Sequence, residues 1–261
     1  MQICTLASSS SGNCTVVREG DTNILIDAGI SMRRITCALR EMGLEPSMLT
    51  AVLVTHEHID HIRGLSTMVK NYDIPVYAPG KVAENAQNII PALHGKLSTI
   101  PVGVDFSIGC VDVRAFHTPH DTQESVGYKI RSGGRAFALA TDLGHVTEEV
   151  LTELIGVNAA VIEANYDTIM LKNGPYPIQQ KKRILSDNGH MSNKLCGRLA
   201  GRLAENGAEK LILGHLSSEN NTPELAYDTV AQELASVGAV PGQNMNLYVA
   251  PRAECGPILE V

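Results

Sequence analysis

Four strong metal ligands crowd into one short stretch of the chain. They lie within seven residues and directly follow the apolar run 51–54: His56, His58, Asp60 and His61. A run that is short, apolar and rich in β-branched residues predicts a buried strand. Ligands at the end of such a strand sit at the carboxyl edge of a sheet, where open α/β sheets place their sites. The stretch therefore predicts a metal site on a loop at a sheet edge.

The types of ligand indicate which ions would bind. Imidazole and carboxylate together suit Zn²⁺, Mn²⁺ or Fe²⁺. His56 and His58 are two residues apart, so in an extended segment their side chains point to the same side. Asp60 and His61 turn into the helix that follows and can face a second ion. Two ions about 3.5–4 Å apart are typical of hydrolases that act on phosphates and amides, so we expect two divalent ions.

Further ligand-type side chains stand where later predicted strands end. His120 follows a strand and a proline that stiffens its loop, and His215 follows the strand expected over 209–214. Asp142 also ends an apolar strand, and a carboxylate there can bridge two ions. Two other histidines are better explained as a strand side chain and a helix-start residue: His117 and His145.

A carboxylate and a histidine form a second candidate group. Glu163 ends the otherwise apolar strand 159–163, where a buried carboxylate without a partner would be costly. The natural partner is a histidine, and His190 follows the helix expected over 176–186. Ser192 is the expected N-cap of the next helix, so His190 is held just before a helix N-terminus. That position suits phosphate binding. An ordinary surface-loop histidine is the alternative.

Two turns near the N-terminus carry polar side chains toward the same edge. The Ser/Gly/Asn loop 8–13 can hold an anion through backbone N–H groups and hydroxyls, which makes Ser11 and Asn13 candidates for phosphate binding. An ordinary hairpin turn is the alternative. Asp27 ends the third expected strand and can orient a metal ligand through a hydrogen bond. Capping of the next helix, at Ser31, is the alternative for that turn.

Composition narrows the class of protein. A chain of 261 residues with 44% hydrophobic content suits one large α/β domain spanning 1–261. No apolar stretch approaches the ~20 residues of a membrane span, and the N-terminus lacks the basic region of a signal peptide. The six scattered cysteines, without a CxxC pair, predict reduced thiols of a cytoplasmic protein. No feature specifies an oligomeric state.

Alternating strand and helix signals define the expected order of elements. A helix is expected over 31–42, and turn signals within 98–140 predict an antiparallel meander. The remaining expected elements are strands at 2–7, 14–18, 23–29, 75–78, 159–163, 209–214 and 245–249, and helices at 62–71, 80–90, 146–155, 176–186, 192–206 and 222–236.

Positive charge is concentrated in one segment of an acidic chain. The net charge of −7 argues against indiscriminate nucleic-acid binding, yet residues 172–202 carry seven basic residues and one acidic residue. That segment is +6, which leaves −13 for the remainder. Lys194, Arg198 and Arg202 are spaced i, i+4, i+8 and share one helix face, where they could track a phosphate backbone. A solvated helix face is the alternative.

These motifs together resemble a known family. The HxHxDH motif at 56–61, followed by His120, Asp142 and His215, resembles the metallo-β-lactamase fold, an αββα sandwich of the α/β class, over essentially the whole chain. Five further motifs are similar to the YycJ (WalJ) group of that superfamily, a relative of ribonuclease Z: SSSGN at 9–13, TPHD at 118–121, EANYD at 163–167, GHMSN at 189–193 and HLSSENN at 215–221. The last motif adds Ser217 to the candidate phosphate-binding residues. The group often has His where this chain has Tyr166, so we assign Tyr166 no ligand role.

The resemblance implies a division of labour among the candidate residues. It implies one ion held by His56, His58 and His120, a second held by Asp60, His61 and His215, and Asp142 between them. A water shared by the two ions would lose its proton near neutral pH and attack phosphorus. Ribonuclease Z implies that His190, oriented by Glu163, protonates the leaving oxygen. The candidate catalytic residues are thus Asp60, Glu163 and His190.

The resemblance also implies the substrate. The YycJ (WalJ) group is associated with DNA 5′-end exonuclease activity, so DNA is expected ahead of RNA. A small-molecule hydrolase of thioesterase or lactonase type is the alternative; it would use the same metal ligands but would need no acid at His190. The third alternative, a non-hydrolytic di-iron redox protein or an inert binding module, is disfavoured because this chain shows no fused flavodoxin-like electron carrier.

Overall fold

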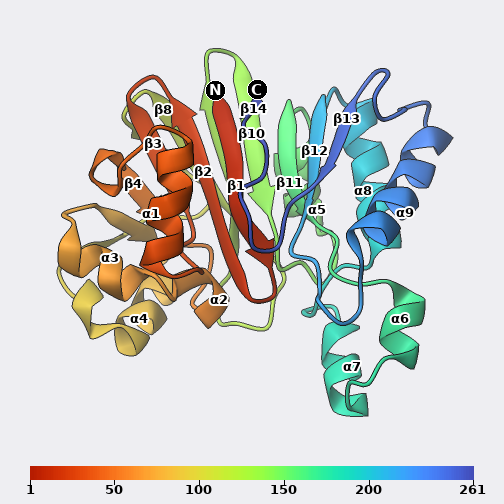
Figure 1. Ribbon diagram of the computed structural model, residues 1–261, viewed down its shortest axis with the longest axis horizontal. Coiled ribbons are helices and arrows are strands. Elements are labelled where there is room, and N and C mark those ends of the chain that lie inside the picture. Colours follow the sequence, from red (N-terminus) through yellow and green to blue (C-terminus); the bar gives the residue numbers. More distant parts are fainter.

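Two seven-stranded sheets stack face to face, and helices cover their outer faces (Figure 1). The computed structural model describes residues 1–261. The first sheet runs, in spatial order, β14 (Leu259–Glu260), β1 (Gln2–Ser9), β2 (Gly12–Glu19), β3 (Thr22–Ile26), β4 (Ala51–Leu53), β5 (Val76–Ala78) and β6 (Leu97–Thr99). The second runs β13 (Asn246–Val249), β12 (Lys210–Gly214), β11 (Ala159–Glu163), β10 (Arg135–Ala140), β9 (Val126–Ser132), β8 (Val111–His117) and β7 (Asp105–Ile108).

The helices divide between the two sheets. The first half of the chain contributes α1 (Met32–Glu41), α2 (Ile59–Ile62), α3 (Leu65–Asn71) and α4 (Gly80–Ile89), with 3₁₀ turns at Pro46–Met48 and Pro91–Leu93. The second half contributes α5 (Glu148–Leu154), α6 (Thr168–Asn173), α7 (Ile178–Ile184), α8 (Asn193–Glu205) and α9 (Pro223–Ser236). In Figure 1, α6 and α7 project away from the sheets. None of the helices combines the length and apolarity needed to cross a membrane.

Side-chain alternation along the strands produces three apolar layers. In β3, Ile24 and Ile26 point into the layer between the sheets, whereas Leu25 points into the layer between the first sheet and its helices. A third layer fills the space between the second sheet and α5, α8 and α9. Both faces of these strands are buried, so they are continuously apolar, and each buried Ile or Leu contributes about 1.5–3 kcal/mol. The αββα sandwich expected from the sequence is confirmed.

Three local expectations need correction. The antiparallel meander comprises only β7 to β10, because Leu97–Thr99 pairs in parallel with β5 at the edge of the first sheet. The helix expected over 62–71 is interrupted at Gly64, whose N–H donates to the Ala28 carbonyl over 2.7 Å. A Cβ at Gly64 would lie 2.5 Å from the Ile30 carbonyl oxygen, so this close approach requires glycine. Helix α6 was not expected, although Asp167 provides its N-cap.

Candidate metal centre

The predicted ligands gather at one edge of the sandwich, after strands β4, β8, β10 and β12. Strands β3 and β4 are parallel neighbours in the first sheet, and β10, β11 and β12 are parallel neighbours in the second. The residues just after these strands therefore meet at one edge of the sandwich. Three of them, Asp27, Asp142 and His215, have φ angles of 60°, 58° and 56°, and no other non-glycine residue has a positive φ. Such backbone strain concentrates at functional sites, because it costs about 1–3 kcal/mol per residue.

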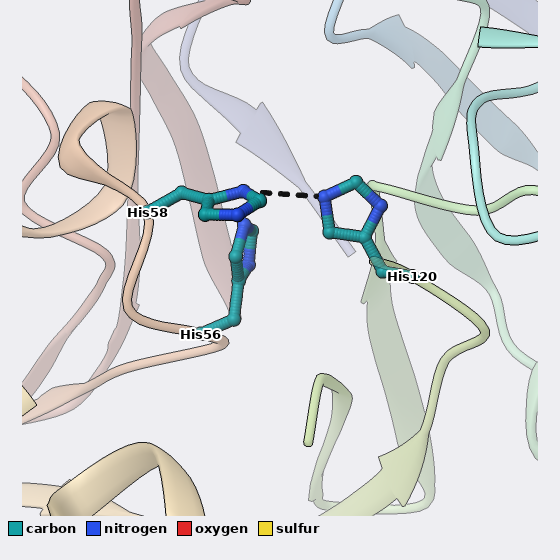
Figure 2. Close-up of side chains that lie close together, drawn as sticks. All are labelled: His56, His58 and His120. Carbon is teal, nitrogen blue, oxygen red and sulfur yellow. Dashed lines mark hydrogen bonds between the residues drawn. The ribbon is translucent and has the colours of Figure 1, made fainter. Parts of the chain in front are cut away.

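Three imidazoles form the first group of ligands (Figure 2). His56, His58 and His120 bring ring nitrogens within 4.8 Å of one another. His120 Nε2 lies 3.3 Å from His58 Nδ1, and the ring of His56 stacks edge-on against both. His56 and His120 are buried, whereas His58 is partly open to solvent.

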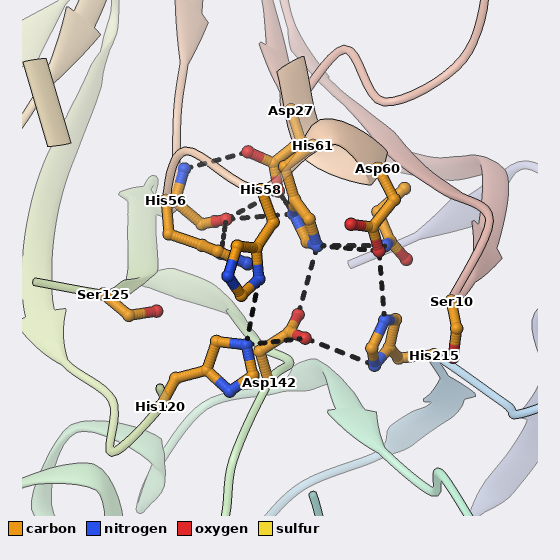
Figure 3. A network of polar contacts seen from close by, with 12 residues as sticks. Ser10, Asp27, His56, His58, Asp60, His61, His120, Ser125, Asp142 and His215 are labelled. Carbon is orange, nitrogen blue, oxygen red and sulfur yellow. Dashed lines mark hydrogen bonds and ion pairs between the residues drawn. The ribbon is translucent and has the colours of Figure 1, made fainter. Parts of the chain in front are cut away.

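Asp60, His61 and His215 form the second group (Figure 3). The Asp60 Oδ2 atom lies 3.6 Å from the Nε2 atoms of both His61 and His215. Asp142 lies between the two groups: its Oδ1 is 3.6 Å from His120 Nε2, and its Oδ2 is 3.3 Å from His61 Nε2. A carboxylate in that position can contact ions in both groups.

The polar atoms at the centre fit divalent cations. The Nε2 atoms of His56 and His215 and the Oδ2 atom of Asp142 are buried and have no hydrogen-bond partner. Buried polar atoms are almost always satisfied, so three such atoms in one place indicate a missing partner. Imidazole and carboxylate donors are those that Zn²⁺, Mn²⁺ and Fe²⁺ accept. The site can therefore hold divalent metal.

Neutral imidazoles characterise the first group. Burial lowers the pKa of His56 well below its usual value and also lowers the pKa of His120. Both rings are therefore neutral at pH 7 and have a nitrogen lone pair available for a metal.

Neighbouring carboxylates raise the pKa values of the two histidines in the second group. Burial alone would lower the pKa of His215, but Asp142, Asp60 and Glu163 outweigh it and raise the pKa to about 10. The pKa of His61 is likewise raised well above its usual value despite burial, chiefly by Asp27 and Asp142. Without metal, protons on these imidazoles balance the carboxylates, and a cation can replace them.

Metal binding should consequently release protons and strengthen with pH. His215, with a metal-free pKa of about 10, is protonated at neutral pH and must lose that proton to coordinate. Each proton released makes the apparent affinity about tenfold higher per pH unit, up to that pKa. Chelator competition between pH 6.5 and 8 measures the slope, and calorimetry in buffers of different ionisation enthalpy counts the protons. An affinity independent of pH would contradict this electrostatic description.

Asp27 orients His61 of the second group through hydrogen bonds on the side of the ring away from Asp60 and Asp142. Its Oδ2 accepts hydrogen bonds from His61 Nδ1 over 2.7 Å and from the Thr55 hydroxyl over 2.9 Å, while its Oδ1 accepts the Thr55 N–H over 2.8 Å. These contacts turn His61 Nε2 toward Asp60 and Asp142. The Ser31 hydroxyl caps α1 by itself, so Asp27 is not needed there.

Asp27→Asn should weaken binding of the ion next to His61. The amide keeps the size of the side chain but loses the charge that orients and polarises the imidazole, so affinity should fall about 10–100-fold. Stepwise metal titration measures this effect, with Asp73→Ala as a surface control of the same charge change. Unaltered binding of both ions would show that Asp27 does not support metal binding.

Gly29 sets the position of the ligand turn. Its backbone passes so close to residue 60 that a Cβ would lie 1.6 Å from the Asp60 carbonyl oxygen. The adjacent Ala28 N–H donates to the His61 carbonyl over 2.8 Å, and the Gly29 N–H donates to the Asn13 carbonyl over 2.8 Å. The turn after β3 thus serves as a backbone template for the short helix that carries Asp60 and His61.

Glu163 contacts two histidines. Its Oε1 accepts from His190 Nδ1 over 2.9 Å and lies 2.7 Å from His215 Nδ1. Its Oε2 accepts the backbone N–H groups of Leu143 and Met191 over 3.0 and 2.8 Å. Burial would raise the pKa of Glu163, but His190 and His215 outweigh it and lower the pKa to about 2. The carboxylate is therefore ionised, and it links the predicted acid to a predicted metal ligand.

A cavity of about 290 Å³ opens over this centre. The predicted residues that line it are His58, Asp60, His120, Asp142, His190, His215 and Ser217. Six further residues line it and were not predicted: Ser10, Asn165, Tyr176, Gln180, Arg183 and Ile184. His117 and His145 do not line it; His145 Nδ1 instead contacts the Asp187 carbonyl over 2.8 Å.

The five other predicted phosphate-binding residues do not line the cavity. Strand β2 begins at Gly12, so the 8–13 loop is a tight hairpin turn. Both serines at its tip are exposed, and Ser10 lines the cavity near His215 (Figure 3), whereas Ser11 does not. Asn13 is buried, and its amide donates to the Ser9 carbonyl over 3.0 Å and contacts His61 Nε2 over 3.1 Å. The basic stripe on α8 is exposed outside the cavity, and its role in phosphate binding stays a prediction: Lys194, Arg198 and Arg202.

Known proteins share this sequence and fold. Residues 22–216 match the family model described as "Beta-lactamase superfamily domain". The chain is 33% identical over 259 residues to Exodeoxyribonuclease WalJ of Streptococcus pneumoniae, covering 98% of this chain and 96% of the relative. It is 35% identical over 248 residues to Exodeoxyribonuclease YycJ of Bacillus anthracis, covering 93% and 92%. The crystal structure of the metallo-beta-lactamase fold protein YhfI from Bacillus subtilis covers 99% of both chains with a TM-score of 0.71 and 15% identity.

Fold, site and relatives agree on the class. The chain belongs to the β-lactamase superfamily and has the metallo-β-lactamase fold, with a metal centre at the edge of the sandwich. Within that superfamily it is a metal-dependent hydrolase of the YycJ (WalJ) group, to which it is related over nearly its full length. The resemblance inferred from the sequence motifs is confirmed.

Proposed function

We propose that this protein is a two-metal phosphodiesterase that removes nucleotides from the ends of DNA. The observation that carries the proposal is the Glu163–His190 pair, joined over 2.9 Å beside a centre with two groups of metal ligands. The relatives at 33% and 35% identity are named exodeoxyribonucleases, which supports DNA as the substrate. All six cysteines are free thiols, which suits work in the reducing cytoplasm.

The chain's own residues have distinct tasks in this reaction. His56, His58 and His120 would hold one ion, and Asp60, His61 and His215 the other, with Asp142 contacting both. Bound divalent ions supply Lewis acidity and a water that deprotonates near neutral pH. The hydrogen bond from Nδ1 to Glu163 fixes the orientation of His190 and leaves Nε2 to give a proton to the leaving oxygen. Ser10, Asn165 and Ser217 provide neutral polar groups at the cavity wall for the phosphate and sugar.

A small-molecule hydrolase of thioesterase or lactonase type is the second candidate. The same ligand groups and a cavity of about 290 Å³ would serve it. A thioesterase would have less use for His190, because a thiolate is a weakly basic leaving group that needs no proton from the protein. His190, oriented by Glu163 beside the centre, favours the phosphodiesterase.

Direct comparison of substrates tests the proposal. Protein loaded with Mn²⁺ or Zn²⁺ is incubated with end-labelled DNA, with end-labelled RNA and with a panel of thioesters. We expect nucleotides to be released from DNA ends, with Mn²⁺ as the better activator because it tolerates six-coordinate geometry. Turnover of a thioester without cleavage of either nucleic acid would overturn the proposal in favour of the second candidate.

A further inference from the structure

Helices α6 and α7 form an arm that contributes no buried side chain to the three main apolar layers. This arm, residues 168–186, projects from the sandwich (Figure 1). Leu171 and Ile184 join Tyr166 in a cluster of only three buried residues, with Tyr176 packed against it. Ile169 and Ile178, at 70% and 73% exposure, are the most exposed large hydrophobic side chains in the molecule. A segment that exposes such side chains next to the metal centre calls for a functional explanation.

The inner side of the arm forms one wall of the cavity. Tyr176, Gln180 and Arg183 line it opposite the metal ligands. The Arg183 Nε atom pairs with Asp121 Oδ2, and Asp121 Oδ1 lies 3.3 Å from His120 Nε2. The ion pair therefore holds the guanidinium next to the first ligand group.

Arg183 retains donors for a further partner. Only its Nε takes part in a hydrogen bond or ion pair, so both terminal nitrogens are uncommitted. A guanidinium presents its donors in a planar fork that matches the oxygens of a phosphate. Arg183 is thus suited to hold a phosphate beside the one that reacts.

The charge of the arm is opposite to that of the protein. Residues 168–186 contain four basic residues and no acidic residue, so the arm is +4 and the rest of the −7 chain is −11. Lys172, Lys181 and Lys182 form no ion pair with any carboxylate. Unpaired cations beside an aromatic side chain, here the half-buried Tyr176, are what proteins use to bind single nucleic-acid strands.

We propose that the α6–α7 arm binds the nucleic-acid strand whose end enters the metal centre. Arg183 holds a phosphate next to the reacting one, Tyr176 and Ile178 contact bases, and the lysines follow the next phosphates. The cavity of about 290 Å³ lies at the small end of ligand pockets and limits entry to about one terminal nucleotide. This inference rests on the proposed function, because it assumes that the substrate is a nucleic acid.

Two triple variants with the same loss of charge test the arm against the rest of the surface. Lys181→Ala/Lys182→Ala/Arg183→Ala changes the arm, and Lys194→Ala/Arg198→Ala/Arg202→Ala changes the exposed stripe on α8. Affinity of the metal-loaded proteins for a phosphorothioate-protected single-stranded oligonucleotide is measured by anisotropy at several salt concentrations. The arm variant should bind at least about tenfold more weakly than the α8 variant. Its slope of log affinity against log salt should be flatter than wild type by about 2, at roughly 0.7 per lost phosphate contact.

Comparison of kcat/KM on two substrates distinguishes loss of strand binding by the arm from disruption of the metal centre. In the arm variant and in Arg183→Lys, kcat/KM on DNA should fall at least about tenfold more than on bis(p-nitrophenyl) phosphate, with metal content equal to wild type. The role of the arm would be overturned if the arm variant kept the affinity and salt slope of wild type, or if the α8 variant lost more affinity. In either case, DNA cleavage by the wild-type protein would still support the proposed function. Thioester turnover by wild type without nucleic-acid cleavage would overturn both.

Discussion

Asp142→Ala is expected to abolish most hydrolytic activity and to lower the metal content of the protein. Asp142 contacts both ligand groups, at 3.6 Å from His120 Nε2 and 3.3 Å from His61 Nε2, and its Oδ2 has no other partner. Losing it would remove a ligand of both proposed ions and several kcal/mol of the charge stabilisation that such ions supply. This corresponds to a loss of about 10³-fold or more in kcat/KM.

Matched variants make the Asp142 result interpretable. Asp142→Asn keeps the shape of the side chain and reports the contribution of the charge, and Asp73→Ala, an exposed acid outside the site, reports the effect of one fewer charge on the protein. Metal content by mass spectrometry and activity on DNA and on a nitrophenyl diester are measured together. A wild-type protein that carries one ion under metal-replete conditions and is fully active would contradict the two-ion proposal.

The ligand-bearing positions could be predicted from the sequence because the ligand-type side chains directly follow apolar strands. An apolar run followed by His or Asp specifies both a buried strand and a polar residue at its carboxyl edge. Parallel strands then bring those residues together whatever their distance along the chain. Asp142 and His215 follow β10 and β12 of one parallel run, and for this reason Asp142 Oδ1 lies 3.5 Å from His215 Nδ1 although the two residues are far apart in the chain.

Contacts that depend on turn register or on packing between distant segments could not be predicted. Ser10, and not Ser11, lines the cavity because the strands extend to Ser9 and from Gly12, a difference of one residue in the turn. The pairing of Arg183 with Asp121 depends on how the arm packs against the loop after β8. Neither contact leaves a periodic or compositional signal.

The contact of Glu163 with two histidines could not be predicted from the sequence either. The cost of burying an unpaired carboxylate predicted its pairing with His190, but nothing in the sequence predicted its 2.7 Å contact with His215. Glu163→Gln should therefore affect more than the acid. The neutral amide orients His215 less firmly, so affinity for the ion at that histidine should fall about 10–100-fold, alongside a moderate loss in kcat.

His190→Ala should lower kcat on DNA by about 10²–10⁴-fold while leaving metal content unchanged, because His190 is proposed to act as an acid and not as a ligand. The competing role is coordination, because His190 also lies in a group of possible ligands with Asp142, Glu163 and His215. Metal analysis of the variant decides between the two roles. Loss of an ion from His190→Ala would show that the ligand assignment is wrong.

The leaving group provides the sharper test of His190. A deoxyribose alkoxide is strongly basic and needs a proton as the phosphorus–oxygen bond breaks, whereas a nitrophenolate is stable without one. The loss caused by His190→Ala should therefore shrink toward unity on a nitrophenyl diester and remain large on DNA. Asp142→Ala should impair both substrates, since hydrolysis of either one would need the bound ions whatever its leaving group. An equal loss on both substrates in His190→Ala would assign His190 to positioning of the phosphate, a role to which the basicity of the leaving group is irrelevant.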